Sequence, residues 1–109
     1  MKVSFDYDYT LDRKDVQRYA TELVNLGFDV WVVTSRFDTE TALSRNWTWI
    51  EDSNLRLFSV VEKCGIPKEK VVFTNMESKS IYIDGKGFIF HLDDCDIELG
   101  DMNYTLAKD

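Results

Sequence analysis

The sequence predicts an α/β domain in which a mostly parallel sheet carries helices on both faces, as three layers. Short apolar runs alternate with amphipathic segments along the 109 residues. The runs are continuous rather than alternating, which is typical of strands buried on both faces. Strands that alternate with helices at this spacing favour parallel units with right-handed crossovers. There is one proline and no low-complexity stretch or repeat, so residues 1–109 are expected to form a single domain.

The first half of the chain contains two expected strands and one helix. Residues 2–6 form a short apolar strand, and Asp12 is expected to cap the helix that follows. Gly27 ends this helix, and the continuous run 28–34 is the second strand. The apolar face of the helix has the spacing of one helical side and consists of Val16, Tyr19, Ala20, Leu23 and Val24.

The second half is less regular. Residues 36–53 show no firm period, so part is expected to be helix and part loop. A helix begins at residue 53 or 54 and ends near Cys64-Gly65. The remaining elements are short: strands at 70–74, 81–83 and 88–92, the last two separated by the turn signal Asp84-Gly85, and a final helix within 97–106.

Composition limits the kinds of partner. The chain is 44% hydrophobic with a net charge of −7, which argues against a general nucleic-acid binder because such proteins carry a basic face. No apolar run approaches the ~18 residues that a membrane span needs, and the N-terminus does not resemble a secretory signal. A cytoplasmic protein with two free thiols, Cys64 and Cys95, is the expectation.

Carboxylates and hydroxyls follow the apolar strands at the points where they end. The stretch FDYDYTL places Asp6 and Asp8 after the first strand, Thr34-Ser35-Arg36 follow the second, and Asp93-Asp94 follow the last. The carboxyl ends of parallel strands meet at one edge of a sheet, where ligands bind. Two carboxylates ~4 Å apart repel by about 4 kcal/mol at an effective dielectric near 20, so a cation or protons must compensate. Oxygen ligands with room for water suit Mg²⁺.

Four short motifs then resemble those of the haloacid dehalogenase-like (HAD) superfamily. Asp6 to Thr10 matches the signature DxDxT, and Thr34 matches the Thr or Ser that closes an apolar strand. Lys79 in TNMESKS matches the family lysine, and Asp93-Asp94 in FHLDD match the final acidic pair. The motifs occur in family order across nearly the whole chain. The resemblance implies a Rossmann-like core and a Mg²⁺-dependent phosphatase.

The family roles can be assigned residue by residue. The resemblance implies that Asp6 is the nucleophile that forms an aspartyl-phosphate, and that Asp8 is the general acid and then the base. Thr34 and Ser35 are expected to bind phosphoryl oxygens, and Lys79 to balance charge. The metal ligands would be the Asp6 carboxylate, the Asp8 backbone carbonyl and Asp94, with Asp93 close behind. Thr10 and Arg36 complete the expected substrate-binding set.

Two departures from the family pattern affect the expected substrate. Tyr9 stands where the family often has Gly, so a ring could shape the mouth of the site. The segments between the motifs are too short for an inserted cap domain. An uncapped site admits large phosphorylated substrates, including macromolecules, and a homo-oligomer partner could instead close it. The alternative function is a HAD-fold protein that binds a metal or a partner with little or no catalysis.

Several residues keep two interpretations. Lys86 rivals Lys79 but is expected at a turn between two strands. His91 is expected to be a packed or hydrogen-bonded strand histidine rather than a metal ligand. Trp47 and Trp49 either pack in the core or an interface, or form a substrate platform with nearby arginines. Glu98 is either a distant partner of the metal site or part of a solvated helix face.

Overall fold

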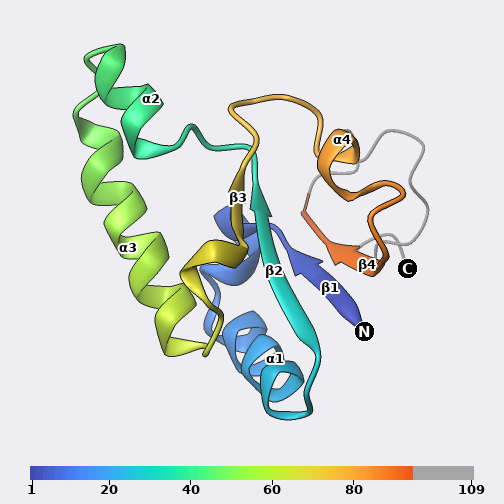
Figure 1. Ribbon diagram of the computed structural model, residues 1–109. Coiled ribbons are helices and arrows are strands. Elements are labelled where there is room, and N and C mark those ends of the chain that lie inside the picture. Colours follow the sequence, from blue (N-terminus) through green and yellow to red (C-terminus); the bar gives the residue numbers. More distant parts are fainter. Residues whose placement is uncertain (95–109) are drawn as a thin grey trace.

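The computed structural model describes residues 1–94, which form an α/β unit around a four-stranded sheet (Figure 1). All strand pairs are parallel, and the strand order is β3-β2-β1-β4. The first strand therefore lies inside the sheet, between the second and the last. This confirms the predicted parallel α/β sheet. The strands are β1 (Lys2–Phe5), β2 (Asp29–Thr34), β3 (Val71–Phe73) and β4 (Phe88–Leu92).

Helices and turns connect the strands. An irregular helical turn, η1, directly follows β1, and a single 3-10 turn, η2, precedes β3. The two longest helices lie between β1 and β2 and between β2 and β3. These elements are η1 (Tyr7–Leu11), α1 (Lys14–Asn25), α2 (Thr39–Ser44), α3 (Trp49–Lys63), η2 (Lys68–Lys70) and α4 (Ser80–Ile83).

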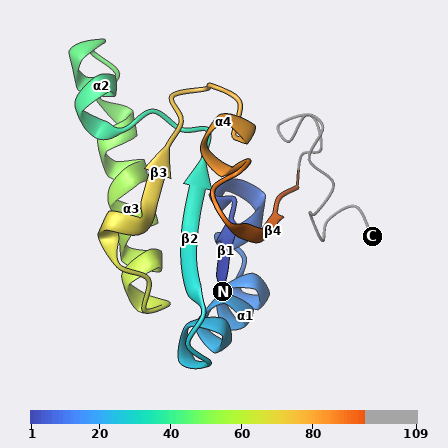
Figure 2. The ribbon, with the colours of Figure 1, turned by 45° about the vertical axis from the view of Figure 1, so that its right-hand side comes forward.

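The two faces of the sheet are covered unequally. Alternate residues of β1 and β2, such as Val3, Phe5 and Val32, are buried in a large cluster with residues of α1 and α3. Val33 has the opposite parity and packs with Ile83 of α4 in a smaller cluster. Figure 2 shows α3 and α1 on one side of the strands and the short α4 on the other. Most apolar burial, and hence most of the hydrophobic stabilisation, lies on the α1–α3 face.

Asp12 is not the cap of α1, contrary to the sequence prediction. Its backbone N–H donates to the carbonyl of Tyr7 at 3.1 Å, so Asp12 closes the turn η1. The helix α1 begins two residues later, at Lys14. The prediction failed because a turn-closing Asp and a helix-capping Asp look alike in sequence.

The predicted strand at 81–83 is also wrong. Residues Ser80–Ile83 form α4, in which the N–H groups of Tyr82 and Ile83 both donate to the Lys79 carbonyl. A segment of three residues fits both the two-residue period of a strand and the 3.6-residue period of a helix, so the pattern could not distinguish them. The helix predicted from residue 53 or 54 begins earlier, at Trp49. The helix predicted within 97–106 lies outside the described residues.

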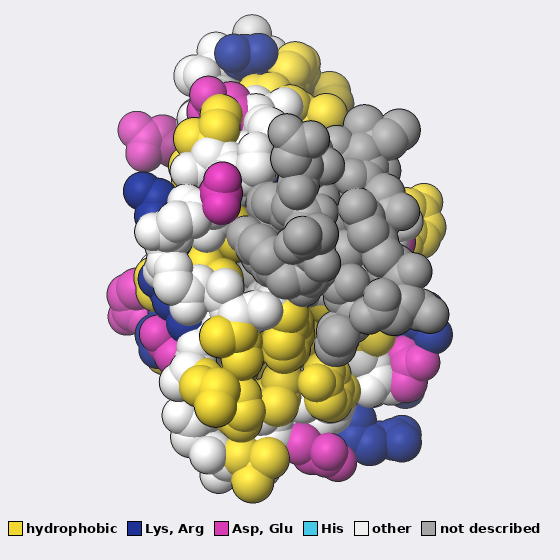
Figure 3. All heavy atoms as spheres, turned by 90° about the vertical axis from the view of Figure 1, so that its right-hand side faces the viewer, with side chains coloured by type: hydrophobic (Ala, Val, Ile, Leu, Met, Phe, Trp, Pro, Cys, Tyr) yellow, Lys and Arg dark blue, Asp and Glu magenta, His cyan; other side chains and the backbone are white. Residues whose placement is uncertain are grey.

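The strand β4 forms one edge of the sheet among the described strands. Figure 3 views the molecule from this side and shows hydrophobic side chains gathered below the grey region. Ile89 of β4 is among the exposed large hydrophobic residues. Cys64 is buried and free, as expected, whereas Cys95 lies outside the described residues. Within residues 1–94, every helix is too short or too polar to cross a bilayer.

Candidate functional site

The carboxyl ends of β1, β2 and β4 meet at a small pocket of about 150 Å³. This is the edge at which parallel sheets bind ligands. Most of the predicted site residues are brought together there, although they come from segments far apart in the sequence. The lining residues are Asp6, Asp8, Tyr9, Ser35, Lys79, Asp93 and Asp94.

The turn after β1 fixes the first of these residues. The Asp6 N–H continues the sheet by donating to the Leu92 carbonyl, and the Asp6 carbonyl accepts from the N–H of Leu11. The chain departs from helical geometry at Asp8 and Tyr9, and Tyr9 has a φ of 61°. A positive φ is sterically costly for any residue other than Gly, and residues with such strained backbones cluster at functional sites. The turn buries Asp6 and leaves the Tyr9 ring exposed.

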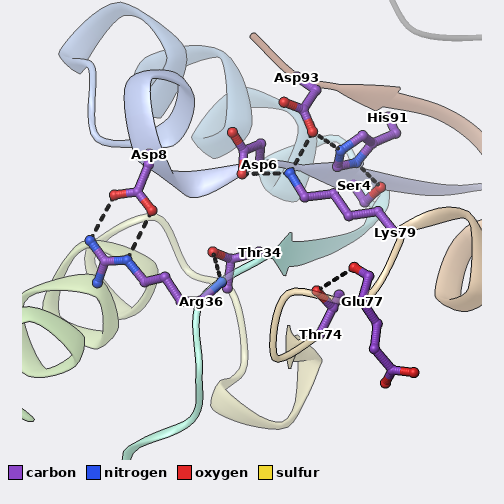
Figure 4. Close-up of polar contacts among 10 residues, drawn as sticks. All are labelled: Ser4, Asp6, Asp8, Thr34, Arg36, Thr74, Glu77, Lys79, His91 and Asp93. Carbon is purple, nitrogen blue, oxygen red and sulfur yellow. Dashed lines mark hydrogen bonds and ion pairs between the residues drawn. The ribbon is translucent and has the colours of Figure 1, made fainter. Parts of the chain in front are cut away.

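Lys79 lies between two buried carboxylates. Its Nζ donates to Oδ1 of Asp6 at 2.8 Å and to Oδ2 of Asp93 at 2.5 Å (Figure 4). The Lys79 residue is only 1% exposed. A lysine is rarely buried to this degree unless it is paired, so the two carboxylates and the ammonium depend on one another. The rival, Lys86, is exposed.

The loop after β3 holds Lys79 in place. The N–H of Met76 donates to the Ser35 carbonyl, and the N–H of Asn75 donates to the Arg36 carbonyl. The Thr74 hydroxyl donates to the Glu77 carbonyl within the loop. These bonds tie the loop to the end of β2, and α4 then begins directly after Lys79.

A buried polar chain extends from Asp93 into the sheet. His91 Nε2 lies 2.8 Å from Oδ2 of Asp93, and His91 Nδ1 lies 2.7 Å from Oγ of Ser4. Burial lowers the pKa of His91 and outweighs the opposing effect of Asp93, so the ring is neutral at pH 7. Because Nε2–H donates to the carboxylate, Nδ1 must accept from the Ser4 hydroxyl. His91 is thus a hydrogen-bonded strand histidine, as predicted.

The pKa values of the neighbouring carboxyl groups of Asp6 and Asp93 are shifted in opposite directions. Burial, with the charge of Asp93, raises the pKa of Asp6 from 3.8 to about 8 against the effect of Lys79. Burial also opposes ionisation of Asp93, but the hydrogen bond from His91 and the charge and hydrogen bond of Lys79 outweigh it and lower the pKa. Burial disfavours the charged form of Lys79 too, yet both carboxylates raise its pKa. One lysine therefore balances one negative charge, on Asp93, and a proton or a further cation must accompany Asp6.

Three carboxylates are placed so that they could share that further cation. Oxygen atoms from Asp6, Asp93 and Asp94 lie within 4.8 Å of one another. Asp6 and Asp93 are buried, whereas Asp94 is exposed. A set made only of carboxylate oxygens, with an open side for water, suits Mg²⁺ and related hard cations. The trio does not by itself select one metal.

Asp8 is held by Arg36 from the end of β2. Arg36 Nε donates to one carboxylate oxygen at 2.9 Å and Nη2 to the other at 2.8 Å. Figure 4 shows the Asp8 carboxylate turned toward Arg36, on the side away from Lys79. Burial lowers the pKa of Arg36, but the hydrogen bonds and charge of Asp8 outweigh it and raise that pKa.

The hydroxyl residues occupy different positions around the pocket. Ser35 lines it, whereas Thr34 is buried and its Oγ1 accepts from the Arg36 N–H at 3.2 Å. Thr10 lines a neighbouring pocket that shares Tyr9, Asp93 and Asp94 with the first. The roles expected of these three residues in substrate binding stay predictions. Glu98 lies outside the described residues.

The tryptophans form an aromatic group with Phe37 and Arg45. The Phe37 and Trp47 rings meet edge to face at 5.1 Å, and the guanidinium of Arg45 lies over both rings. Trp49 is 65% exposed, with its ring 6.2 Å from that of Trp47. Trp49 therefore does not lie in the core of the described chain, and a role in substrate binding stays a prediction.

Three contributors were not identified from the sequence. Ser4 interrupts an apolar strand, and its register opposite His91 is set by a pairing between the first and last described strands. The bidentate Arg36–Asp8 pair joins residues 28 positions apart. Asn54 accepts from Arg36 and is buried in α3. Only Ser4 has a signal in the sequence, as a hydroxyl between the apolar residues Val3 and Phe5.

The geometry is therefore that of buried and exposed carboxylates around one lysine at the edge of a parallel sheet. No protein-family model matches the chain, and no match was found among the curated proteins or the solved structures that were compared with it.

Proposed function

We propose that this chain is a Mg²⁺-dependent phosphohydrolase of the HAD type, without a cap domain, that works through an aspartyl-phosphate on Asp6. The observation that supports it best is the Lys79 bridge between Asp6 and Asp93, beside the exposed Asp94. A purely structural ion pair needs no third carboxylate at the same point and no open pocket. This arrangement has a third carboxylate and an open pocket, and it lies at the edge of the sheet where ligands bind.

Asp6 is the proposed nucleophile. Its carboxylate oxygen would attack the phosphorus of a phosphate ester, forming the O–P bond of an acyl phosphate as the bond to the leaving oxygen breaks. Lys79 is in contact with Asp6 and would balance part of the charge on the phosphoryl oxygens. Ser35, on the pocket wall, would donate to one of these oxygens.

Asp8 is the proposed acid and base. It would give a proton to the leaving oxygen in the first step. In the second step it would take a proton from a water that attacks phosphorus, which releases inorganic phosphate and restores the Asp6 carboxylate. Asp8 lines the same pocket as Asp6, two residues further along the turn.

The carboxylate trio fits the metal that this chemistry needs. Asp6 and Asp94 would hold Mg²⁺, with the backbone carbonyl of Asp8 and with Asp93 close behind. Bound there, the ion would neutralise charge on the phosphoryl group and orient it. The one lysine at the trio leaves Asp6 without a full counter-charge, which is why a cation is expected there.

The lack of an inserted domain in the described chain around the pocket is relevant to the size of the proposed substrate. Between η1 and β2 the chain forms only α1, and between β2 and Lys79 it forms α2, α3, η2 and β3. Neither segment contains an inserted domain that could enclose the pocket. This supports a substrate with a large leaving group, and the proposed substrate is defined only as a phosphate ester.

The test is hydrolysis of an aryl phosphate and of a panel of phosphate esters, with and without Mg²⁺. We expect metal-dependent release of phosphate that Asp6→Asn abolishes, because the amide is no longer a nucleophile. Asp15→Asn, which removes an exposed carboxylate outside the pocket, is the matched control and should retain full activity. Absence of turnover on the whole panel, or full activity of Asp6→Asn, would contradict the proposal.

The alternative is a metal-binding protein of the same fold with little catalysis. The observation that favours it is Asp8, whose two oxygens both accept from Arg36 rather than facing Lys79. Beryllofluoride distinguishes the two, because this phosphoryl mimic is trapped by a competent carboxylate nucleophile in the presence of Mg²⁺. Mg²⁺ binding without beryllofluoride binding would favour the alternative.

A further inference from the structure

We propose that Arg36 is a positioning residue for Asp8, and that it transmits the placement of α3 to the acid–base group of the reaction. The inference rests on the proposed function and deepens it. It assigns to Arg36 a task different from the substrate binding that its sequence position suggests.

The contacts of the guanidinium support this assignment. Nε and Nη2 donate to the two oxygens of Asp8, which is the bidentate geometry that only Arg can give. Nη1 donates to the Ser53 carbonyl at 3.0 Å and to Oδ1 of Asn54 at 3.2 Å. Every nitrogen of the guanidinium is thus engaged with the protein.

Asn54, which accepts from the Arg36 guanidinium, is itself held in place by hydrogen bonds. Asn54 is 1% exposed, and its Nδ2 donates to the Phe37 carbonyl and to Oγ1 of Thr39. The Asn54 side chain therefore joins α3 both to the segment that follows β2 and to Arg36. The guanidinium also lies over the ring of Tyr7, with its carbon 4.9 Å from the ring centroid.

Asp8 needs such support because its own turn gives little. It lies where η1 departs from helical geometry, and its side chain is 45% exposed. A carboxylate at that position would sample several rotamers without a partner. The pair with Arg36 selects one, at the wall of the pocket that contains Asp6.

Arg36→Gln and Arg36→Lys test this through turnover of an aryl phosphate. Misplacement of a reacting group by about 1 Å can cost about 100-fold in rate. We expect both variants to lower kcat by about 10- to 100-fold with little change in KM. Lysine keeps the charge but cannot donate to both oxygens of Asp8 while reaching Ser53. A rise in KM alone would instead indicate direct substrate binding, and a wild-type rate in Arg36→Lys would show that charge suffices; either result overturns the proposal.

A double variant separates positioning from general damage. If Arg36 acts through Asp8, Arg36→Gln should lower kcat no further in an Asp8→Asn background, whereas a structural defect would lower it again. Retained Mg²⁺ and beryllofluoride binding in Arg36→Gln shows that the Asp6 side of the site is folded. Arg18→Gln removes an equal charge from an exposed arginine of α1 that lines neither pocket at the site, and it should leave kcat unchanged. An inert wild type would overturn the proposed function and this inference together, whereas an active wild type with an unaffected Arg36→Gln would overturn the inference alone.

Discussion

Lys79 and Asp6 are 73 positions apart in the sequence, and in the structure the Lys79 ammonium donates a 2.8 Å hydrogen bond to the Asp6 carboxylate. Both residues are buried, and the same ammonium contacts Asp93. The pair joins the turn after the first strand to the residue that precedes α4. The charge balance of the site, and its predicted response to metal, depend on this relationship.

Replacement of Lys79 should destabilise the metal-free protein strongly. Lys79→Met leaves Asp93 as a buried charge without its ammonium partner, and breaking a buried pair in this way typically costs about 3–5 kcal/mol. Urea unfolding monitored by circular dichroism measures the loss. Saturating Mg²⁺ should restore part of it, since the ion supplies positive charge at the same carboxylates.

Lys86→Met is the control for that experiment. Lys86 is exposed, and its replacement should change the free energy of unfolding by no more than about 0.5 kcal/mol. If Lys79→Met were as stable as Lys86→Met with and without Mg²⁺, the buried bridge would not hold the site together.

The stability of the metal-free protein should fall as the pH rises from about 7 to about 8. Below this range the lowered pKa of His91 opposes the effect of Asp6, because the unfolded state then binds a proton that the native ring does not. The pKa of Asp6 is raised to about 8 in the folded state, so below that value the native state binds a proton that the unfolded state has already lost. Its stabilising effect is complete below pH 4 and is lost as the pH rises through 8. Denaturation in the presence of a chelator at several pH values measures this slope.

In the presence of Mg²⁺ the free energy of unfolding should instead rise with pH, because metal binding requires the ionised carboxylate and releases a proton. The apparent affinity for Mg²⁺ should therefore rise up to about pH 8 and then level off, as titration calorimetry in buffers of different ionisation enthalpy would show. Asp6→Asn should remove both effects, whereas Asp15→Asn should keep both because Asp15 is exposed and has a lowered pKa. A stability that is flat or rises over pH 7 to 8 without metal would show that Asp6 is not protonated in this range.

Glycine should be favoured over alanine at position 9. Tyr9 has a φ of 61°, where a Cβ costs roughly 1–2 kcal/mol that Gly avoids. We therefore expect Tyr9→Gly to be more stable than Tyr9→Ala by about 1 kcal/mol in urea unfolding. The comparison of two variants removes the contribution of the lost ring.

The same pair of substitutions at Glu22 gives the control. Glu22 is exposed within α1, where Ala is favoured over Gly by about 1 kcal/mol. An order at position 9 that matches the order at position 22 would mean that the turn relaxes out of the left-handed conformation.

The sequence predicted the frame of the sheet well. The bounds of β4 were predicted to the residue, and β1 and β2 differ from prediction by one residue each. Long continuous apolar runs carry this information, because burial on both faces requires them. The convergence of Asp6, Asp93 and Lys79 followed from the same reasoning together with the motifs.

The contacts of polar side chains were less predictable. The pairing of Asp8 with Arg36 depends on where the turn points a side chain, which spacing does not specify. The bond between Ser4 and His91 depends on the register of β1 against β4, which a sequence does not reveal for non-adjacent strands. The sequence of α4 predicts a strand, because three residues cannot distinguish the period of a strand from that of a helix.

The strand order β3-β2-β1-β4 also has a consequence for the order of events during synthesis. Asp6 is made among the first residues, but Asp93, His91 and the strand that pairs with β1 on its outer side are made about eighty-five residues later. Domains emerge from the ribosome N-terminus first, and contacts between distant residues form late because a long loop must close. A nascent chain that ends before β4 would present Asp6 beside an unpaired strand edge. The contacts of Lys79 and His91 with Asp93 can form only after the last described strand has been made.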